Sequence, residues 1–263
     1  MQYKCVFSDI DGTLLNSQHK ITNKTKTKIQ KLVNQGIPFV LVSARTPGGI
    51  KKVVDQLAVK VPIISYSGGM VIDENDKVIY SKGLSVAKVK EIYKFIKKNF
   101  EISINICSND CWMSDNLENP WVKQEAVITG LIPEKLDFTK IVEVHKILCM
   151  ADKNIIDLVE QKLLEKYDFL SIYKSKDTYL EIMDKSISKA NAINLLCEKK
   201  DIDITKTISF GDNYNDIDML LTTGLGFAMA NAPQGVLNQM VRHTRSNDQD
   251  GIVYALENLI EKE

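Results

Sequence analysis

The sequence predicts an α/β domain that is interrupted by an inserted α+β domain. Three observations lead to this prediction: strand-like and helix-like segments alternate at the start of the chain, the alternation is lost from about Leu84, and it returns after Ser188. The chain has 263 residues, 44% of them hydrophobic, which is enough apolar material for one large domain or two modest ones.

The first part of the chain has the order of a βαβ unit. Short apolar runs predict buried strands, and apolar residues at helical spacing predict the helices between them, the first of which is closed by Gly36. The expected elements are a strand at 4–10, a helix at 22–35, a strand at 37–45, a helix at 47–57, a strand at 61–68 and two short strands within 70–81.

The middle of the chain has a different texture. Helical segments are followed there by groups of short strand candidates, which is typical of helices packed on one side of an antiparallel sheet. The expected elements are a helix at 85–100, strands near 102–107, 112–114 and 141–150, a helix at 154–167, and strands at 169–176 and 178–184.

The last part returns to alternation. The expected elements are a helix at 188–200, a strand at 207–212, a helix at 215–224, a strand at 225–230, and helices at 233–241 and 251–260. We therefore expect a Rossmann-like parallel-sheet core formed by residues 1–82 and 186–263, with an inserted α+β domain at 83–185.

Charge and composition limit the kinds of partner. Lys plus Arg and Asp plus Glu both total 34, so the formal net charge of zero indicates neither a nucleic acid nor a membrane-surface partner. The first residues lack the pattern of a signal peptide, and no apolar run is long enough to span a bilayer. The five cysteines are scattered and form no CxxC pair. We expect a cytoplasmic protein that is a monomer or a small homo-oligomer.

Two carboxylates separated by one residue follow the first predicted strand, in the run Asp9-Ile10-Asp11-Gly12-Thr13. In an open α/β sheet, ligands bind at the carboxyl ends of the strands. Neighbouring carboxylates repel each other unless a cation such as magnesium relieves the repulsion. An ionised Asp9 can attack phosphorus, Gly12 permits a sharp turn, and Thr13 can bond the loop or a phosphate oxygen. The alternative is an Asp-Gly turn that merely ends a strand.

A second polar run, Gly211-Asp212-Asn213-Tyr214-Asn215-Asp216, ends another predicted strand. It brings two more acids and two amides to the same edge of the sheet. Magnesium needs only one or two protein carboxylates in addition to phosphate and water. A helix cap would explain any one of these polar residues, but it does not explain the cluster.

Two further residues become candidate site residues only because the two acidic runs are present in the same sequence. The Ser43 hydroxyl and the backbone N–H groups beside it follow a predicted strand and can bind phosphate. Lys189 stands at the expected start of a helix, where a lysine is usually solvated.

In this order the segments resemble the motifs of the haloacid dehalogenase (HAD) superfamily of phosphatases, in particular its Cof-like branch with a large type IIB cap domain. The matching segments are residues 9–15 for the first motif, Ser43 for the second, Lys189 for the third, and Gly211-Asp212 with Asn215-Asp216 for the fourth. Asn231-Ala232-Pro233 and Asp250-Gly251-Ile252 are also similar to the family. The departures from its usual pattern are Ala44, Ser67-Gly68-Gly69 and Ala190, and none of them removes a catalytic functional group.

The resemblance implies a phosphoric monoester hydrolase (EC 3.1.3.-) that requires Mg²⁺ and acts on a small phosphorylated metabolite such as a sugar phosphate. It implies that Asp9 is the nucleophile and that Asp11 is the general acid and base. The implied magnesium ligands are Asp9, the backbone carbonyl of Asp11 and Asp212. Asp216 is implied to support these ligands without binding the metal itself. The implied phosphate-binding groups are the backbones of Ile10 and Ala44 and the side chains of Ser43, Lys189 and Asn215.

The inserted domain is expected to close over the site as a cap that excludes water. Two alternatives to a hydrolase remain open. A phosphomutase or phosphotransferase would pass the phosphoryl group to another hydroxyl, and a non-catalytic sensor would only bind phosphorylated metabolites. The presence of Asp9 and Asp11 together argues against the sensor, because a pure binder needs neither a nucleophile nor an acid.

Overall fold

The structure is a computed structural model that describes residues 3–260. The chain forms two compact units. The first unit is made of residues up to 45, residues 50–81 and residues from 188 onward, and the second is made of residues 46–49 and 82–187. Within residues 3–260, no helix combines the length and the apolar character needed to cross a membrane.

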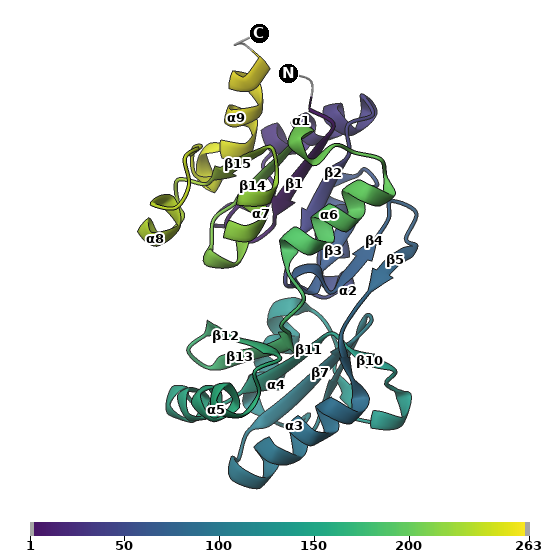
Figure 1. Ribbon diagram of the computed structural model, residues 1–263, viewed down its shortest axis with the longest axis vertical. Helices are drawn as coiled ribbons and strands as arrows, with labels where there is room; N and C mark the ends of the chain where they lie inside the picture. The colour runs from purple at the N-terminus through teal and green to yellow at the C-terminus, as the bar shows by residue number, and fades with distance from the viewer. Residues whose placement is uncertain (1–2, 261–263) are drawn as a thin grey trace. The chain divides into compact units, whose positions relative to one another are not determined.

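The first unit is built on a seven-stranded sheet with the order β15-β14-β1-β2-β3-β4-β5. The strands from β15 to β3 are parallel, and β4 and β5 are antiparallel additions at one edge. The strands are β1 (Cys5–Asp9), β2 (Phe39–Val42), β3 (Ile63–Ser65), β4 (Met70–Ile72), β5 (Val78–Ser81), β14 (Thr207–Gly211) and β15 (Leu225–Ala228). The predicted parallel-sheet α/β core is therefore confirmed (Figure 1).

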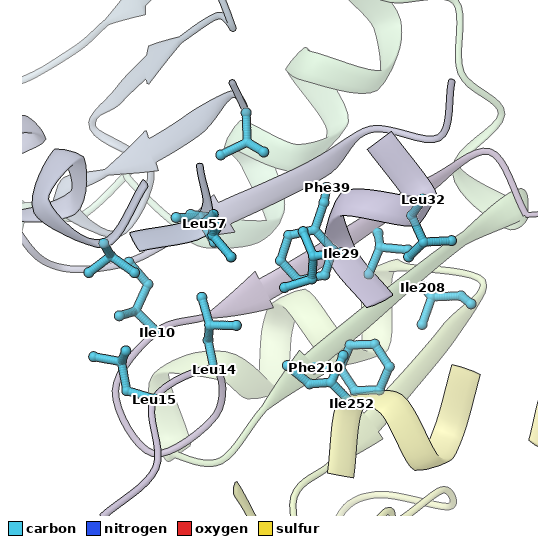
Figure 2. Close-up of a cluster of buried hydrophobic side chains, with 14 of the residues drawn as sticks. Ile10, Leu14, Leu15, Ile29, Leu32, Phe39, Leu57, Ile208, Phe210 and Ile252 are labelled. Atoms are coloured by element: carbon cyan, nitrogen blue, oxygen red, sulfur yellow. The ribbon is translucent and has the colours of Figure 1, made fainter. Parts of the chain in front are cut away.

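Helices cover both faces of this sheet. They are α1 (Asn23–Asn34), α2 (Pro47–Leu57), α6 (Lys189–Lys199), α7 (Ile217–Thr222), α8 (Gln234–Leu237) and α9 (Gly251–Ile260). Side chains of α1, α2 and α9 pack on one face, around Phe39 and Phe210, as Figure 2 shows. Side chains of α6, α7 and α8 pack on the other face, around Phe7 and Val40. Because both faces are covered, the parallel strands are mainly apolar, although buried serines lie within β1 (Ser8) and β14 (Ser209).

The second unit is built on a six-stranded sheet with the order β12-β13-β11-β7-β8-β9. Its pairs are antiparallel except for β8 with β9. The strands are β7 (Ser103–Ser108), β8 (Cys111–Ser114), β9 (Glu134–Lys135), β11 (Lys146–Met150), β12 (Leu170–Lys176) and β13 (Tyr179–Asp184). Helices α3 (Val86–Asn99) and α5 (Lys153–Lys166) share one hydrophobic core with alternate residues of these strands. This confirms the predicted packing of helices on one side of an antiparallel sheet.

The second unit differs from the prediction in several places, the first of which is the short edge strand β9, which was not predicted. The strand expected at 141–150 is two strands, because β10 (Glu143–Val144) pairs with β6 (Leu84–Ser85) while β11 joins the larger sheet. Helix α4 (Pro120–Thr129) was not predicted, because its sequence has no apolar stripe of helical period. In the structure Val122 is the one buried residue of this helix. Its start was signalled only by Asn119, whose side chain accepts a hydrogen bond from the Trp121 N–H, and by Pro120.

Candidate active site

The topology of the first unit brings three strand ends together. Strand β1 lies between β2 and β14 and runs parallel to both, so the order of connection reverses at β1 (Figure 1). Asp9 is the last residue of β1, Ser43 follows β2, and Asp212 follows β14. Residues that are far apart in the sequence therefore meet at the edge of the sheet where α/β folds bind ligands.

Lys189 is buried between two carboxylates. It is the first residue of α6 and only 1% exposed. Its Nζ donates to Asp9 Oδ1 at 2.6 Å and also to Asp216 Oδ1. Burial alone would lower the pKa of Lys189, but the Asp216 and Asp9 carboxylates outweigh burial and raise it. The lysine is therefore held in its charged form beside Asp9.

Asp216 uses both of its carboxylate oxygens within the protein. One accepts from Lys189, and the other accepts from the backbone N–H groups of Asp212 and Asn213, at 3.0 and 2.9 Å. Asp216 thus fixes the position of the lysine and the conformation of the loop after β14. This arrangement favours the supporting role expected for Asp216 from the sequence.

The carboxylates outnumber the lysine at this site. Oxygen atoms of Asp9, Asp212 and Asp216 lie within 4.8 Å of one another. Burial raises the pKa of Asp9 well above its ordinary value, and the charges of Asp216 and Asp212 add to the effect. Burial likewise raises the pKa of Asp212 to about 6, although Thr13 Oγ1 donates to Asp212 Oδ1 at 2.6 Å. The excess negative charge and the all-oxygen donor set fit a divalent cation such as Mg²⁺.

Two of the three clustered carboxylates are available to such a cation. Since the Asp216 oxygens are already bonded, the carboxylates left to hold it are those of Asp9 and Asp212. Gly12 makes room for this arrangement: its φ is +82°, and a Cβ at this position would lie 2.3 Å from Asp212 Oδ2. The carboxylate of Asp11 is not part of this cluster.

Asp11 instead pairs with Arg45. Arg45 Nε donates to Asp11 Oδ2 at 2.8 Å and Nη2 donates to Oδ1 at 2.6 Å, which is a two-pronged ion pair. The two side chains are 34% and 49% exposed, for arginine and aspartate respectively. Sequence reasoning did not select Arg45, and its position directly after Ser43 and Ala44 was the available signal.

The expected phosphate-binding residues lie around the same strand ends. Ser43 is buried, and its Oγ accepts from the Arg45 N–H at 3.2 Å. Ala44 is half-buried beside it, and the Ile10 side chain packs in the core. Asn215 lies exposed on the turn that precedes α7.

The Ser67-Gly68-Gly69 segment forms a strained turn beside Ser43. Tyr66, Ser67 and Gly68 have φ values of +52°, +54° and +112°. The Ser67 N–H donates to the Ser43 carbonyl at 2.9 Å, and a Cβ on Gly68 would lie 2.2 Å from the Ser188 carbonyl oxygen. The turn therefore packs closely between the loop at Ser43 and the start of α6.

Two asparagines hold the loop that carries Asp11. Asn231 Nδ2 donates to the Gly12 carbonyl at 2.8 Å, and its Oδ1 accepts from the Asn247 N–H at 3.0 Å. Asn247 Nδ2 in turn donates to the Leu15 carbonyl at 2.9 Å. The Asn231-Ala232-Pro233 segment had been noted only as similar to the family, and Asn247 was missed, because their partners are backbone carbonyls more than 200 residues away.

Comparison with known proteins places this fold and site in a family. The profile of the haloacid dehalogenase-like hydrolase family matches residues 6–256. A Haemophilus influenzae protein named "Putative phosphatase" is 37% identical over 258 residues, which cover 98% of each chain. A haloacid dehalogenase-like hydrolase from Bacteroides thetaiotaomicron has a similar structure, with a TM-score of 0.89, 29% identity, and coverage of 98% of this chain and 100% of that one.

The chain belongs to the haloacid dehalogenase-like hydrolases, as its motifs predicted. The HAD subclass IIB sugar phosphatase BT4131 shares the fold, with a TM-score of 0.82 and 22% identity over 97% of this chain and 98% of that one. The family match and the name of the Haemophilus relative together support a phosphoric monoester hydrolase.

Proposed function

We propose that this protein is a magnesium-dependent phosphatase that hydrolyses small phosphate monoesters, with sugar phosphates as the favoured class, through an aspartyl-phosphate on Asp9. The observation that carries the proposal is the buried Lys189 beside Asp9, in a cluster where carboxylates exceed the cations of the protein. Such a cluster is costly unless a cation such as Mg²⁺ offsets its excess negative charge, and that cation together with Lys189 can then attract a phosphoryl group.

The reaction proceeds in two displacements. In the first, an Asp9 oxygen attacks phosphorus, the bond from phosphorus to the ester oxygen breaks, and Asp11 gives that oxygen a proton. In the second, Asp11 takes a proton from water, the water oxygen attacks phosphorus, and the bond from phosphorus to Asp9 breaks. Inorganic phosphate leaves, and both aspartates return to their starting state.

The remaining residues stabilise charge and geometry. Lys189, Ser43, Asn215 and the backbones of Ile10 and Ala44 bind the phosphoryl oxygens, while Asp216 holds Lys189 in place. Magnesium, held by Asp9, Asp212 and the Asp11 backbone carbonyl, supplies positive charge to the phosphoryl oxygens. The second unit selects the substrate through its contacts with the non-phosphate part.

Phosphate release tests this proposal directly. The native protein, Asp9→Asn and the control Asp76→Asn are assayed with magnesium or with chelator on sugar phosphates, nucleotides and 4-nitrophenyl phosphate. Asp76 is a suitable control because it lies on a surface turn with its side chain 75% exposed. Magnesium-dependent release that Asp9→Asn abolishes and Asp76→Asn retains is expected.

Other outcomes point to the alternatives. Phosphate that appears on a second sugar position would replace the hydrolase with a mutase. Tight binding of phosphate esters without release would replace it with a sensor. Faster release from nucleotides than from sugar phosphates would overturn only the substrate class.

A further inference from the structure

Arg45 connects two parts of the proposed site. Its backbone N–H donates to Ser43 Oγ at 3.2 Å, and its carbonyl accepts from the Tyr66 N–H at 3.2 Å, so its main chain is fixed on both sides. Its side chain reaches the Asp11 carboxylate with two donors, at 2.8 and 2.6 Å. A guanidinium that binds both oxygens of a carboxylate fixes the orientation of that carboxylate as well as its position.

The Asp11 side chain needs an external support of this kind. It follows the end of β1 and precedes Gly12, whose φ of +82° turns the chain, and it is 49% exposed. Asn231 holds the backbone of the loop at Gly12, but this contact leaves the Asp11 side chain free to rotate. A proton donor must nevertheless lie within hydrogen-bond reach of the leaving oxygen in a productive direction.

We propose that Arg45 is a positioning residue that orients the Asp11 carboxylate for proton transfer to the leaving group. The inference rests on the proposed function, because it assumes that Asp11 is the general acid. In this proposal the Arg45 side chain contacts the Asp11 carboxylate and touches neither the phosphoryl group nor the leaving oxygen.

The dependence of the rate on the leaving group distinguishes this role from a structural one. A sugar alkoxide is a poor leaving group and needs a proton as it departs, whereas 4-nitrophenolate departs without one. The ratio kcat/KM reports on the steps up to formation of the aspartyl-phosphate, and therefore on this proton donation and not on the later hydrolysis. A misoriented Asp11 therefore lowers kcat/KM for the sugar phosphate and leaves kcat/KM for the aryl phosphate nearly unchanged.

The experiment measures kcat/KM for the best sugar phosphate of the panel and for 4-nitrophenyl phosphate. The variants are Arg45→Gln, Arg45→Lys, Asp11→Asn and the double variant Arg45→Gln/Asp11→Asn. Arg242→Gln is the matched control, because Arg242 is exposed and lies outside the site. Melting temperatures of all variants show whether each one is folded.

Arg45→Gln is expected to lower kcat/KM for the sugar phosphate by about 10- to 100-fold and for the aryl phosphate by less than about threefold. Arg45→Lys should recover part of the loss, since an ammonium keeps the charge but loses the two-pronged geometry. Arg45→Gln should cause no further loss when Asp11 is already Asn.

Two results would overturn the inference: an equal loss for both substrates, which assigns Arg45 to phosphate binding, or no loss for either. These failures are distinguishable from failure of the proposed function. Retained activity in Asp9→Asn refutes the proposed reaction. The expected pattern in Asp11→Asn without the same pattern in Arg45→Gln refutes only the role of Arg45.

Discussion

Among residues 3–260, each unit of the molecule buries one lysine against carboxylates, and the two environments differ in their charge balance. In the first unit, Lys189 meets Asp9 and Asp216, with Asp212 close to both. In the second unit, Lys146 Nζ lies 3.1 Å from Glu181 Oε2, and both side chains are about one-tenth exposed. The nearby Glu125 pairs with Lys176 at 3.7 Å, so that two lysines face two glutamates.

This difference in charge balance distinguishes the candidate active site of the first unit from the structural ion pair of the second unit. In the second unit Lys146 and Glu181 neutralise each other, and Tyr173 OH also donates to Glu181 at 2.9 Å. Within residues 3–260, Glu125 Oε2 has no hydrogen-bond partner, and its charge is offset by the ion pair with Lys176.

The first unit leaves negative charge that its own residues do not neutralise. Burial raises the pKa of both Asp9 and Asp212, and the charge of Asp216 adds to the effect. Uncompensated buried charge, more than burial of charge as such, indicates where a ligand is needed.

The largest expected effect is that of Lys189→Met. It leaves Asp9 and Asp216 buried without a cation, and we expect the free energy of unfolding to fall by roughly 3–5 kcal/mol. Phosphate release should be lost as well. Urea unfolding and the phosphate assay measure the two effects, with Lys162→Met, on the surface of α5, as the control. Retained release would show that Lys189 does not act on the phosphoryl group.

Lys146→Met tests the other side of the comparison. We expect a smaller loss of stability, about 2–3 kcal/mol, because Glu181 keeps its hydrogen bond from Tyr173 and a little solvent contact. Release from 4-nitrophenyl phosphate should persist. The double variant Lys146→Met/Glu181→Leu should recover most of the stability, since both charges are then absent. A loss of release as complete as in Lys189→Met would remove the distinction between the two lysines.

Asp212→Asn should stabilise the metal-free protein at pH 7 by roughly 1–3 kcal/mol. The pKa of Asp212 is raised to about 6, so the folded state holds a proton that the unfolded chain releases near pH 4. Stability of the metal-free native protein therefore falls as the pH rises from about 4 to 6, and this fall should be smaller in the variant.

Urea unfolding at pH 5 and pH 7, in chelator and in magnesium, measures both effects of Asp212→Asn. Magnesium should stabilise the native protein more than the variant, because it binds the folded state through Asp212. Asp76→Asn provides the control for removal of an exposed charge. Equal stabilisation of Asp212→Asn and the native protein by magnesium would exclude Asp212 as a ligand.

The smallest expected effect is that of Asn231→Ala. It removes two hydrogen bonds on the protein surface, and we expect a loss of about 1 kcal/mol. Phosphate release should fall severalfold, because the loop that carries Asp11 is held less firmly. Asn238→Ala, which removes a single contact with Gln234, is the control and should leave release unchanged. Equal rates for the two variants would show that the asparagine bridge is only structural.

Much of the fold follows from local pattern. Strand β1 is a mainly apolar run that ends in Asp9, β14 is one that Asp212 follows, and helix α2 has the predicted bounds of Pro47–Leu57. Helix α4 and the division between β10 and β11 do not follow from pattern. The first has little buried surface of its own, and the second depends on which neighbouring strand each half pairs with.

By itself, the sequence determined the order of strands and helices in the core, the family, and the polar residues that stand at the strand ends, among them Asp9, Ser43 and Asp212. These features depend on local spacing, which a sequence records directly. The tertiary structure alone decided which of these residues meet: Lys189 between Asp9 and Asp216, Arg45 on Asp11, and Asn231 on the Gly12 carbonyl. Such contacts join residues separated by 27 to 219 positions, and only the packing of the parallel sheet sets their distances and their charge balance.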